Sequence, residues 1–403
     1  MRLRVLLLAL LIVVVSVRIL YWVRVARRTP DTVHQIPSIK WTRPFGAVHP
    51  FWTSPLLSRD GSLILASLDG VVYALDARGT LIWTYRIGLR EFIAGGLLQD
   101  RDGNIYFSTL DKVFSLNRAG LKRWEASCTP PKLAQDDQGA TFDDTTFYTT
   151  CGKHFSAFNK TDGTRLWTQP PFEGESAPAV LQNGTLVFVR DRHIIAADRD
   201  GNELWAYPPA NAAPLGGIYP QDIYFDSPVA VAPDQSLYVG SRNNRLVALD
   251  SDGVLKWTFD AGVMQGYRAS PLVASDGTVF VVNSRGMVTA FSPEGTVKWT
   301  FQLSVRNGMQ ATPVLGADGT IYFAADPGLV AISPDGRKLW DLALSGFAAG
   351  SPTLAPDGTL YLATIDGVLY AVQTASPGLM QNAWPKYQHD AANSGRFEGG
   401  TEQ

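Results

Sequence analysis

The residues most often used in catalysis and metal binding are few in this sequence, and they are widely separated. The two cysteines, Cys128 and Cys151, are neither adjacent nor spaced as a Cys-x-x-Cys pair. No two histidines have the spacing of a metal-binding pair; they are His34, His49, His154, His193 and His389. We also find no nucleophile elbow and no phosphate-binding loop. We therefore predict no catalytic residues and no metal site, and we expect binding rather than catalysis.

Arginines and aromatic residues in the expected loops offer a different kind of chemistry. Aromatic rings beside guanidinium groups can bind an anionic ligand or a partner peptide. The candidate binding face consists of Trp52, Phe92, Tyr224, Tyr267, Arg268, Arg192, Arg242, Arg245 and Arg285. The alternative is that loops are simply where polar and aromatic side chains tolerate exposure. Which of these residues share a face depends on the elements that position them.

A glycine followed four residues later by a tryptophan recurs seven times and indicates the architecture. The first pair is Gly79 and Trp83, and the last is Gly336 and Trp340. A period of roughly 40 residues is typical of a solenoid or a propeller. Because the motif recurs in every unit, we assign its tryptophans to packing between units rather than to ligand stacking. The structural tryptophans are Trp41, Trp83, Trp124, Trp167, Trp205, Trp257, Trp299 and Trp340.

Each repeat carries the signals of four short antiparallel strands. It opens with Ser-Pro or a related pair, passes through an Asp-Gly or Asn-Gly turn, and ends with the Gly-x-x-x-Trp hairpin. Turns such as Asp60-Gly61 favour tight hairpins, because their central residues need positive φ. No segment of helical periodicity separates the repeats, which excludes a parallel α/β sheet. We predict an all-β fold, an eight-bladed β-propeller of four-stranded antiparallel blades, over residues 38–373.

The last repeat lacks its own Gly-x-x-x-Trp strand after the segment 369–372. The segment 39–42 near the other end of the chain resembles that missing strand. We therefore predict that the strand containing Trp41 completes the last blade, pairs with the strand containing Ala371, and closes the ring without an exposed sheet edge.

The two cysteines fall in loops that should share one face of such a propeller. Cys128 lies in the link into the third blade, and Cys151 opens the turn between that blade's second and third strands. We therefore predict a possible disulfide between them, which would indicate an oxidising compartment. The alternative is two unrelated buried thiols.

The ends of the chain differ from the repeats. Residues 1–30 contain an apolar run from Val5 to Val23 flanked by arginines, which favours an uncleaved membrane anchor over a cleaved signal segment. More arginines follow the run than precede it, which weakly opposes export of the C-terminal side, but we still expect the propeller to be exported. Residues 374–403 form a C-terminal tail in which we assign His389 and Asp390 to packing or capping. The net charge of −2 offers no general attraction to nucleic acid, and we expect a monomer.

These motifs resemble the PQQ-type (pyrroloquinoline-quinone-like) β-propeller repeat family, from about Ser38 to Gln373. The Ala-Leu-Asp and Gly-x-x-x-Trp elements are similar to the tryptophan-docking motif that locks adjacent blades in that family. The tail from Trp384 to Gly395 is similar to a segment common in its bacterial members. The family includes quinoprotein dehydrogenases and non-catalytic scaffolds such as the outer-membrane assembly lipoprotein.

The two branches of that family imply different functions. The dehydrogenases use PQQ, a calcium ion and a pair of adjacent cysteines beside the quinone, and this chain lacks that pair. The resemblance therefore implies the scaffold branch, without a cofactor. We expect a bacterial cell-envelope protein, periplasmic or extracellular and tethered by its N-terminal segment, that binds a protein or envelope ligand at one face. The alternative is a PQQ-dependent dehydrogenase acting on an alcohol or a sugar.

Overall fold

The structure is a computed structural model of the chain. It describes residues 37–45, 51, 53–88, 93, 96–109, 111–128, 139–151, 154–170, 176–209, 223–262, 266–305, 311–325, 328–348 and 350–396. The chain divides into two compact units, Met1–Ile36 and Pro37–Gln403. The predicted membrane segment, residues 1–30, lies outside the described residues. Within the described residues, no helix is long and apolar enough to cross a membrane.

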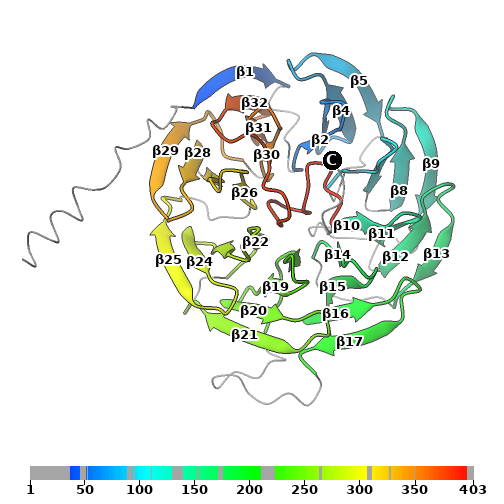
Figure 1. The fold of residues 1–403 in the computed structure, drawn as a ribbon. Helices are drawn as coiled ribbons and strands as arrows, with labels where there is room; N and C mark the ends of the chain where they lie inside the picture. Colours follow the sequence, from blue (N-terminus) through cyan, green and yellow to red (C-terminus); the bar gives the residue numbers. More distant parts are fainter. Residues whose placement is uncertain are drawn as a thin grey trace, which may run out of the picture. The chain divides into compact units, whose positions relative to one another are not determined.

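The described part of the second unit consists of eight four-stranded antiparallel sheets arranged as the blades of a ring, which confirms the predicted β-propeller (Figure 1). Blade 1 contains β2 (Leu56–Leu57), β3 (Leu63–Ala66), β4 (Val71–Leu75) and β5 (Leu81–Arg86), and blade 2 contains β6 (Leu98–Gln99), β7 (Ile105–Ser108), β8 (Lys112–Leu116) and β9 (Lys122–Ser127). Blade 3 contains β10 (Ala140–Phe142), β11 (Thr146–Cys151), β12 (His154–Asn159) and β13 (Arg165–Thr168), and blade 4 contains β14 (Ala179–Val180), β15 (Leu186–Arg190), β16 (His193–Ala197) and β17 (Glu203–Tyr207).

Blades 5 to 8 follow the same order from the inner strand to the outer strand. Blade 5 contains β18 (Ala230–Val231), β19 (Leu237–Gly240), β20 (Arg245–Leu249) and β21 (Leu255–Asp260), and blade 6 contains β22 (Leu272–Val273), β23 (Val279–Val282), β24 (Met287–Phe291) and β25 (Val297–Gln302). Blade 7 contains β26 (Val314–Leu315), β27 (Ile321–Ala325), β28 (Gly328–Ile332) and β29 (Lys338–Ala343), and blade 8 contains β30 (Thr353–Leu354), β31 (Thr359–Ala363), β32 (Val368–Gln373) and β1 (Ser38–Pro44).

The core lies between the faces of neighbouring blades. The second strands, such as β3 and β7, are buried along their whole length, because a blade packs on each of their faces. Ile64 and Val72 of blade 1 share a hydrophobic cluster with Ile105 and Phe107 of blade 2. Outer strands such as β5 instead alternate between exposed and partly buried residues. Second strands such as β3 and β7 are therefore continuous runs of buried residues, whereas in outer strands such as β5 exposed and partly buried residues alternate.

The ring closes as the sequence predicts. Strand β1 pairs antiparallel with β32, and Trp41 lies opposite Ala371. The Trp41 indole donates a hydrogen bond of 3.0 Å to the carbonyl oxygen of Ala77 in blade 1, and its ring packs beside Tyr361 at 5.9 Å between centroids. The N-terminal strand therefore belongs to the last blade and contacts the first one. It pairs with the edge of β32 that would otherwise be exposed.

The other repeat tryptophans make the same kind of contact with the following blade. Six more indole N–H groups donate to a carbonyl oxygen in the last hairpin turn of the next blade; the donors are Trp83, Trp124, Trp167, Trp205, Trp257 and Trp299. The glycine of that turn lies under the ring. At Gly120, φ is +75° and an added Cβ would lie 2.5 Å from the Trp83 ring. Both the left-handed backbone and the close approach of the ring therefore require glycine at this position. Trp340 packs against Tyr322 in its own blade.

Candidate functional site

Links between blades and turns between second and third strands form one face of the propeller, which we call the link face. The Arg242 amide in such a turn donates to the carbonyl oxygen of Tyr224 in a link (2.7 Å), and the Ser284 amide donates to Gly266 in the next link (2.9 Å). The same pairing joins Ile365 to Phe347 at 3.0 Å. The structure therefore places the two kinds of loop together, as the sequence predicts.

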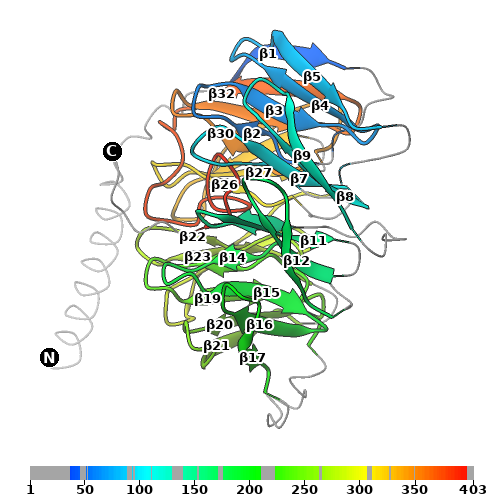
Figure 2. The ribbon, with the colours of Figure 1, turned by 90° about the vertical axis from the view of Figure 1, so that its right-hand side faces the viewer.

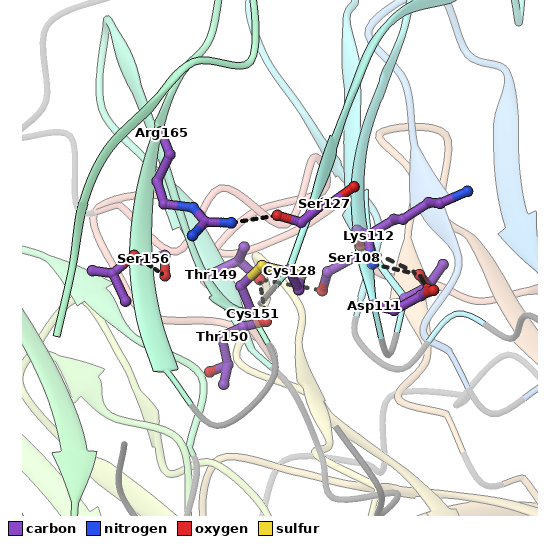
Figure 3. Close-up of a disulfide and its surroundings, with 12 residues drawn as sticks. Ser108, Asp111, Lys112, Ser127, Cys128, Thr149, Thr150, Cys151, Ser156 and Arg165 are labelled. Carbon is purple, nitrogen blue, oxygen red and sulfur yellow. Dashed lines mark hydrogen bonds between the residues drawn. A yellow bond between two sulfur atoms is a disulfide. The ribbon is translucent and has the colours of Figure 1, made fainter. Parts of the chain in front are cut away.

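A disulfide joins Cys128 to Cys151 on this face and confirms the predicted bond (Figure 3). The sulfur atoms are 2.00 Å apart and the Cα atoms 5.1 Å apart. Both cysteines are buried, and the bond ties the link that leaves β9 to the end of β11. Nearby, the Thr149 hydroxyl donates to Ser108 of blade 2 (3.2 Å). Blades 2 and 3 are thus connected both covalently and by hydrogen bonds.

Asp226 organises the arginines of blades 5 and 6. Its two carboxylate oxygens accept hydrogen bonds from Arg242, from Nε at 3.1 Å and from Nη2 at 2.9 Å. The Nε atom of Arg268 lies 3.7 Å from the same carboxylate. Both guanidinium groups are exposed at the surface, with side-chain exposures of 60% and 46%. One carboxylate therefore serves two exposed guanidinium groups.

Arg192 and Tyr224 complete this cluster from the side of blade 4. The Arg192 guanidinium carbon lies 3.8 Å from the centre of the Tyr224 ring, a cation–π contact. Tyr224 is 43% exposed, so one side of the pair faces solvent. Asp191 and Arg192 form the turn between β15 and β16 with positive φ angles of 48° and 69°. An arginine in the left-handed region is unfavourable, and such strain concentrates at functional sites.

Two of the predicted binding-face residues are buried and cannot contact a partner at the surface. Tyr267 is 2% exposed and Arg245 is 5% exposed. Arg245 turns inward because its guanidinium pairs with Asp260 at 3.2 Å. Burial raises the pKa of Tyr267 well above its ordinary value. Their burial argues against direct contact of these two candidate residues with a partner.

The remaining predicted residues divide into one that is exposed and two that fall outside the described residues. Arg285 is exposed in the turn between β23 and β24, beside the link that contains Gly266. Trp52 and Phe92 lie outside the described residues. Sequence reasoning missed the role of Asp226, a single carboxylate surrounded by arginines. The only signal was its place in the link next to Tyr224.

The C-terminal segment, residues 376–396, lies at the centre of the ring, against the inner strands (Figures 1 and 2). Five inner strands donate an amide hydrogen bond from their last residue to a carbonyl oxygen of this segment. The pairs are Leu57 to Ala391, Gln99 to Ala392, Val180 to Gly395, Val273 to Trp384 and Leu315 to Pro385, at 2.7–3.1 Å. These residues precede the first hairpin turn of each blade, at the end of the inner strand away from the link face. The segment is therefore a folded part of the propeller.

Lys386 is the centre of that segment and is fully buried. Its ammonium group donates to the carbonyl oxygens of Tyr387 and Asp390, both at 3.1 Å, and to the side chain of Asn393. Asn393 in turn donates to the carbonyl oxygen of Leu97 before β6 (2.9 Å). Burial lowers the pKa of Lys386 to about 7. This lysine organises a loop, because it is surrounded by oxygen atoms of its own segment.

The described residues bear on one requirement of a PQQ-dependent enzyme, its calcium site. Among them, no group of three or more His, Cys, Asp or Glu residues could hold a metal ion. The disulfide connects Cys128, in the link after β9, with Cys151 at the end of β11, and these two cysteines are not adjacent in the sequence. We assign no reaction step to such a cofactor.

A ring of eight four-stranded blades that carry this repeated hairpin is a PQQ-type β-propeller. A family profile described as "Outer membrane protein assembly factor BamB" matches residues 68–220, 199–309 and 284–384. These matches cover most of the chain, and the chain therefore belongs to this family. This membership indicates a non-catalytic propeller scaffold.

Solved structures with the same fold include both branches of the predicted family. BamB from Moraxella catarrhalis is 18% identical, with a TM-score of 0.67 over 84% of this chain and 98% of that one. A europium-containing methanol dehydrogenase is 14% identical, with a TM-score of 0.65 over 84% of this chain and 93% of that one. At these identities the likeness shows the fold alone.

Two curated relatives match a shorter part of the chain. These are the serine/threonine-protein kinases AfsK of Streptomyces griseus and Streptomyces coelicolor, 31% identical over 119 residues and 32% identical over 124 residues. The matched regions are 28% and 29% of this chain but only 14% and 15% of the kinases.

Proposed function

We propose that this chain is an exported, membrane-tethered propeller scaffold whose link face binds a protein or another component of the cell envelope. The family it belongs to is described by an outer-membrane assembly factor, which supports a scaffold over an enzyme. The propeller acts as a monomer in this proposal, because the ring closes within one chain.

The position of the C-terminal segment is the observation that carries the choice of face. It occupies the inner strands at their hairpin-turn ends, away from the link face. On the link face, Arg192, Tyr224, Arg242 and Arg285 are all exposed. Tyrosine and arginine are enriched among the residues that contribute most to interface energy. The two observations together favour the link face for binding.

The disulfide supports export. Disulfides form and persist in the periplasm and outside the cell, and they are rare in the cytosol. The Cys128–Cys151 bond is buried, so it belongs to the folded propeller rather than to a flexible exposed loop. The N-terminal segment, residues 1–30, is the proposed tether.

Site-specific photo-crosslinking tests the choice of face. A photoreactive amino acid at Tyr224 should crosslink to a discrete envelope partner, and the same group at Arg78 should not. Both positions are exposed, but Arg78 lies in the last hairpin turn of blade 1, next to the Trp41 contact, away from the link face. Equal crosslinking from both positions, or partners only from Arg78, would contradict the proposal.

The second candidate function is a quinoprotein dehydrogenase, which the shared fold of the methanol dehydrogenase brings into consideration. Purified protein would be mixed with PQQ and calcium, or with PQQ and europium, and assayed for dye reduction with an alcohol or a sugar. Turnover well above a control without quinone would replace the scaffold proposal.

A further inference from the structure

Three turns of the link face in adjacent blades carry an exposed arginine. The turns between second and third strands carry Arg192 in blade 4, Arg242 in blade 5 and Arg285 in blade 6. The equivalent turns of blades 8, 1 and 2 instead carry an aspartate each, Asp366, Asp69 and Asp111. Among the described turns of the link face, arginine therefore occurs in blades 4 to 6 and aspartate in blades 8, 1 and 2, although Asp191 shares a turn with Arg192 and Arg86 at the end of β5 lies 3.9 Å from Asp69.

The described acidic groups beside these arginines are fewer than the arginines. Four exposed guanidinium groups, those of Arg192, Arg242, Arg268 and Arg285, face two carboxylates, Asp191 and Asp226. The carboxylate of Asp260 lies on the same side of blade 5, but the buried Arg245 pairs with it at 3.2 Å. Among the described residues of blades 4 to 6, positive charge therefore exceeds negative charge on this face.

The geometry of the cluster fits a carboxylate ligand. Arg242 already holds a carboxylate through two parallel hydrogen bonds, which is the preferred arrangement of these two groups. Arg268 lies farther from the same carboxylate, at 3.7 Å, and can take a second one. The exposed ring of Tyr224, with Arg192 stacked on it, adds a flat apolar surface beside the charges.

We propose that the link face over blades 4 to 6 binds an acidic segment of a partner polypeptide, whose carboxylates pair with Arg192, Arg242 and Arg268 while an apolar side chain packs on Tyr224. This inference rests on the proposed binding function of the link face. Nucleic acid is a poorer match, because tight binding there requires neutralisation of many phosphates. The charge excess here suits a peptide with two or three carboxylates.

Fluorescence anisotropy with a defined probe tests this inference. The probe is a short fluorescein-labelled peptide that alternates Glu with Ser and Phe, and the same peptide with Lys in place of Glu is its control. The protein should bind the Glu peptide, and affinity should fall as salt rises. The triple variant Arg192→Gly, Arg242→Ser and Arg268→Ser should bind roughly tenfold to a hundredfold more weakly. Glycine at residue 192 also relieves the positive φ of 69°.

Two further variants separate recognition from a structural effect. Asp226→Asn removes the internal competitor for Arg242 and Arg268, so it should tighten binding of the Glu peptide severalfold. The matched control replaces three exposed arginines of hairpin turns away from the link face, Arg59, Arg78 and Arg118, by serine and should leave binding within about twofold.

Several results would overturn the inference. These are no binding of the Glu peptide at low salt, equal binding of the Lys peptide, weaker binding by Asp226→Asn, or an equal loss in the control triple variant. Tighter binding of a single-stranded oligonucleotide of matched charge would assign the surface to nucleic acid instead. If the Glu peptide fails but Tyr224 still crosslinks to an envelope partner, the proposed function stands and only the acidic chemistry is wrong.

Discussion

Replacement of Gly120 by alanine tests whether the contact between blades depends on the tryptophan ring. Gly120 has a φ of +75°, and an added Cβ would lie 2.5 Å from Trp83. Gly61 is the matched control, because its φ is +81° and an added Cβ would meet nothing within 4 Å. Both glycines close a hairpin turn with an amide hydrogen bond of 2.9 Å. The two positions therefore differ in the ring and share the backbone strain.

The expected losses of stability follow from the backbone strain and from the contact with the tryptophan ring. A left-handed backbone costs a non-glycine residue roughly 1–2 kcal/mol, which both variants pay. Overpacking against the ring adds about 1–3 kcal/mol in Gly120→Ala alone. The melting temperature of Gly120→Ala should therefore be lower than that of Gly61→Ala by several degrees, at about 2–4 °C per kcal/mol for domains of 150–250 residues and less for a longer one.

A double-mutant cycle identifies the ring as the cause. In a Trp83→Ala background the ring is gone, so Gly120→Ala should cost no more than Gly61→Ala does in the same background. Differential scanning calorimetry or fluorimetry gives the melting temperatures. Equal losses for the two glycine variants in the wild-type background, or an extra loss at Gly120 that persists without Trp83, would refute the reasoning.

Three other predictions concern ring closure, the disulfide and the buried lysine. Trp41→Ala should destabilise the propeller by less than the ~3–5 kcal/mol of a fully buried tryptophan, because Trp41 is partly exposed. An unchanged melting temperature would contradict the closure contact. The double variant Cys128→Ser and Cys151→Ser lacks the disulfide, so its free energy of unfolding should be lower by roughly 3 kcal/mol. Alkylation of intact cells followed by mass spectrometry should find no free thiol. Because burial lowers the pKa of Lys386 from 10.5 to about 7, the folded protein binds fewer protons than the unfolded chain between these values. Stability should therefore rise with pH through this window, and Lys386→Met should remove that part of the slope in melting temperature.

Local patterns in the sequence were sufficient for the repeat architecture. The Asp-Gly turns, the short apolar runs and the recurring tryptophan determine strands and hairpins through neighbouring residues, and each repeat supplies an independent copy of the signal. The same spacing predicted that β1 completes the last blade, and that Cys128 and Cys151 share a face. Each of these inferences depends on the position of a residue within a repeat that the other blades define.

Only the tertiary structure decided which loop residues are available and what fills the ring. Arg242 lies in the turn before β20 and Arg245 is the first residue of that strand, yet Arg245 is buried and pairs with Asp260, whereas Arg242 is exposed and pairs with Asp226. The C-terminal segment has no repeat to align with, and its partners are backbone amides of strands far away in the sequence. Nearly every residue has a backbone amide, so the pattern of side chains did not predict these backbone contacts, which the side chains of Gln388 and Asn393 supplement by donating to Ala140 and Leu97. They form where the closed ring brings the inner strands together.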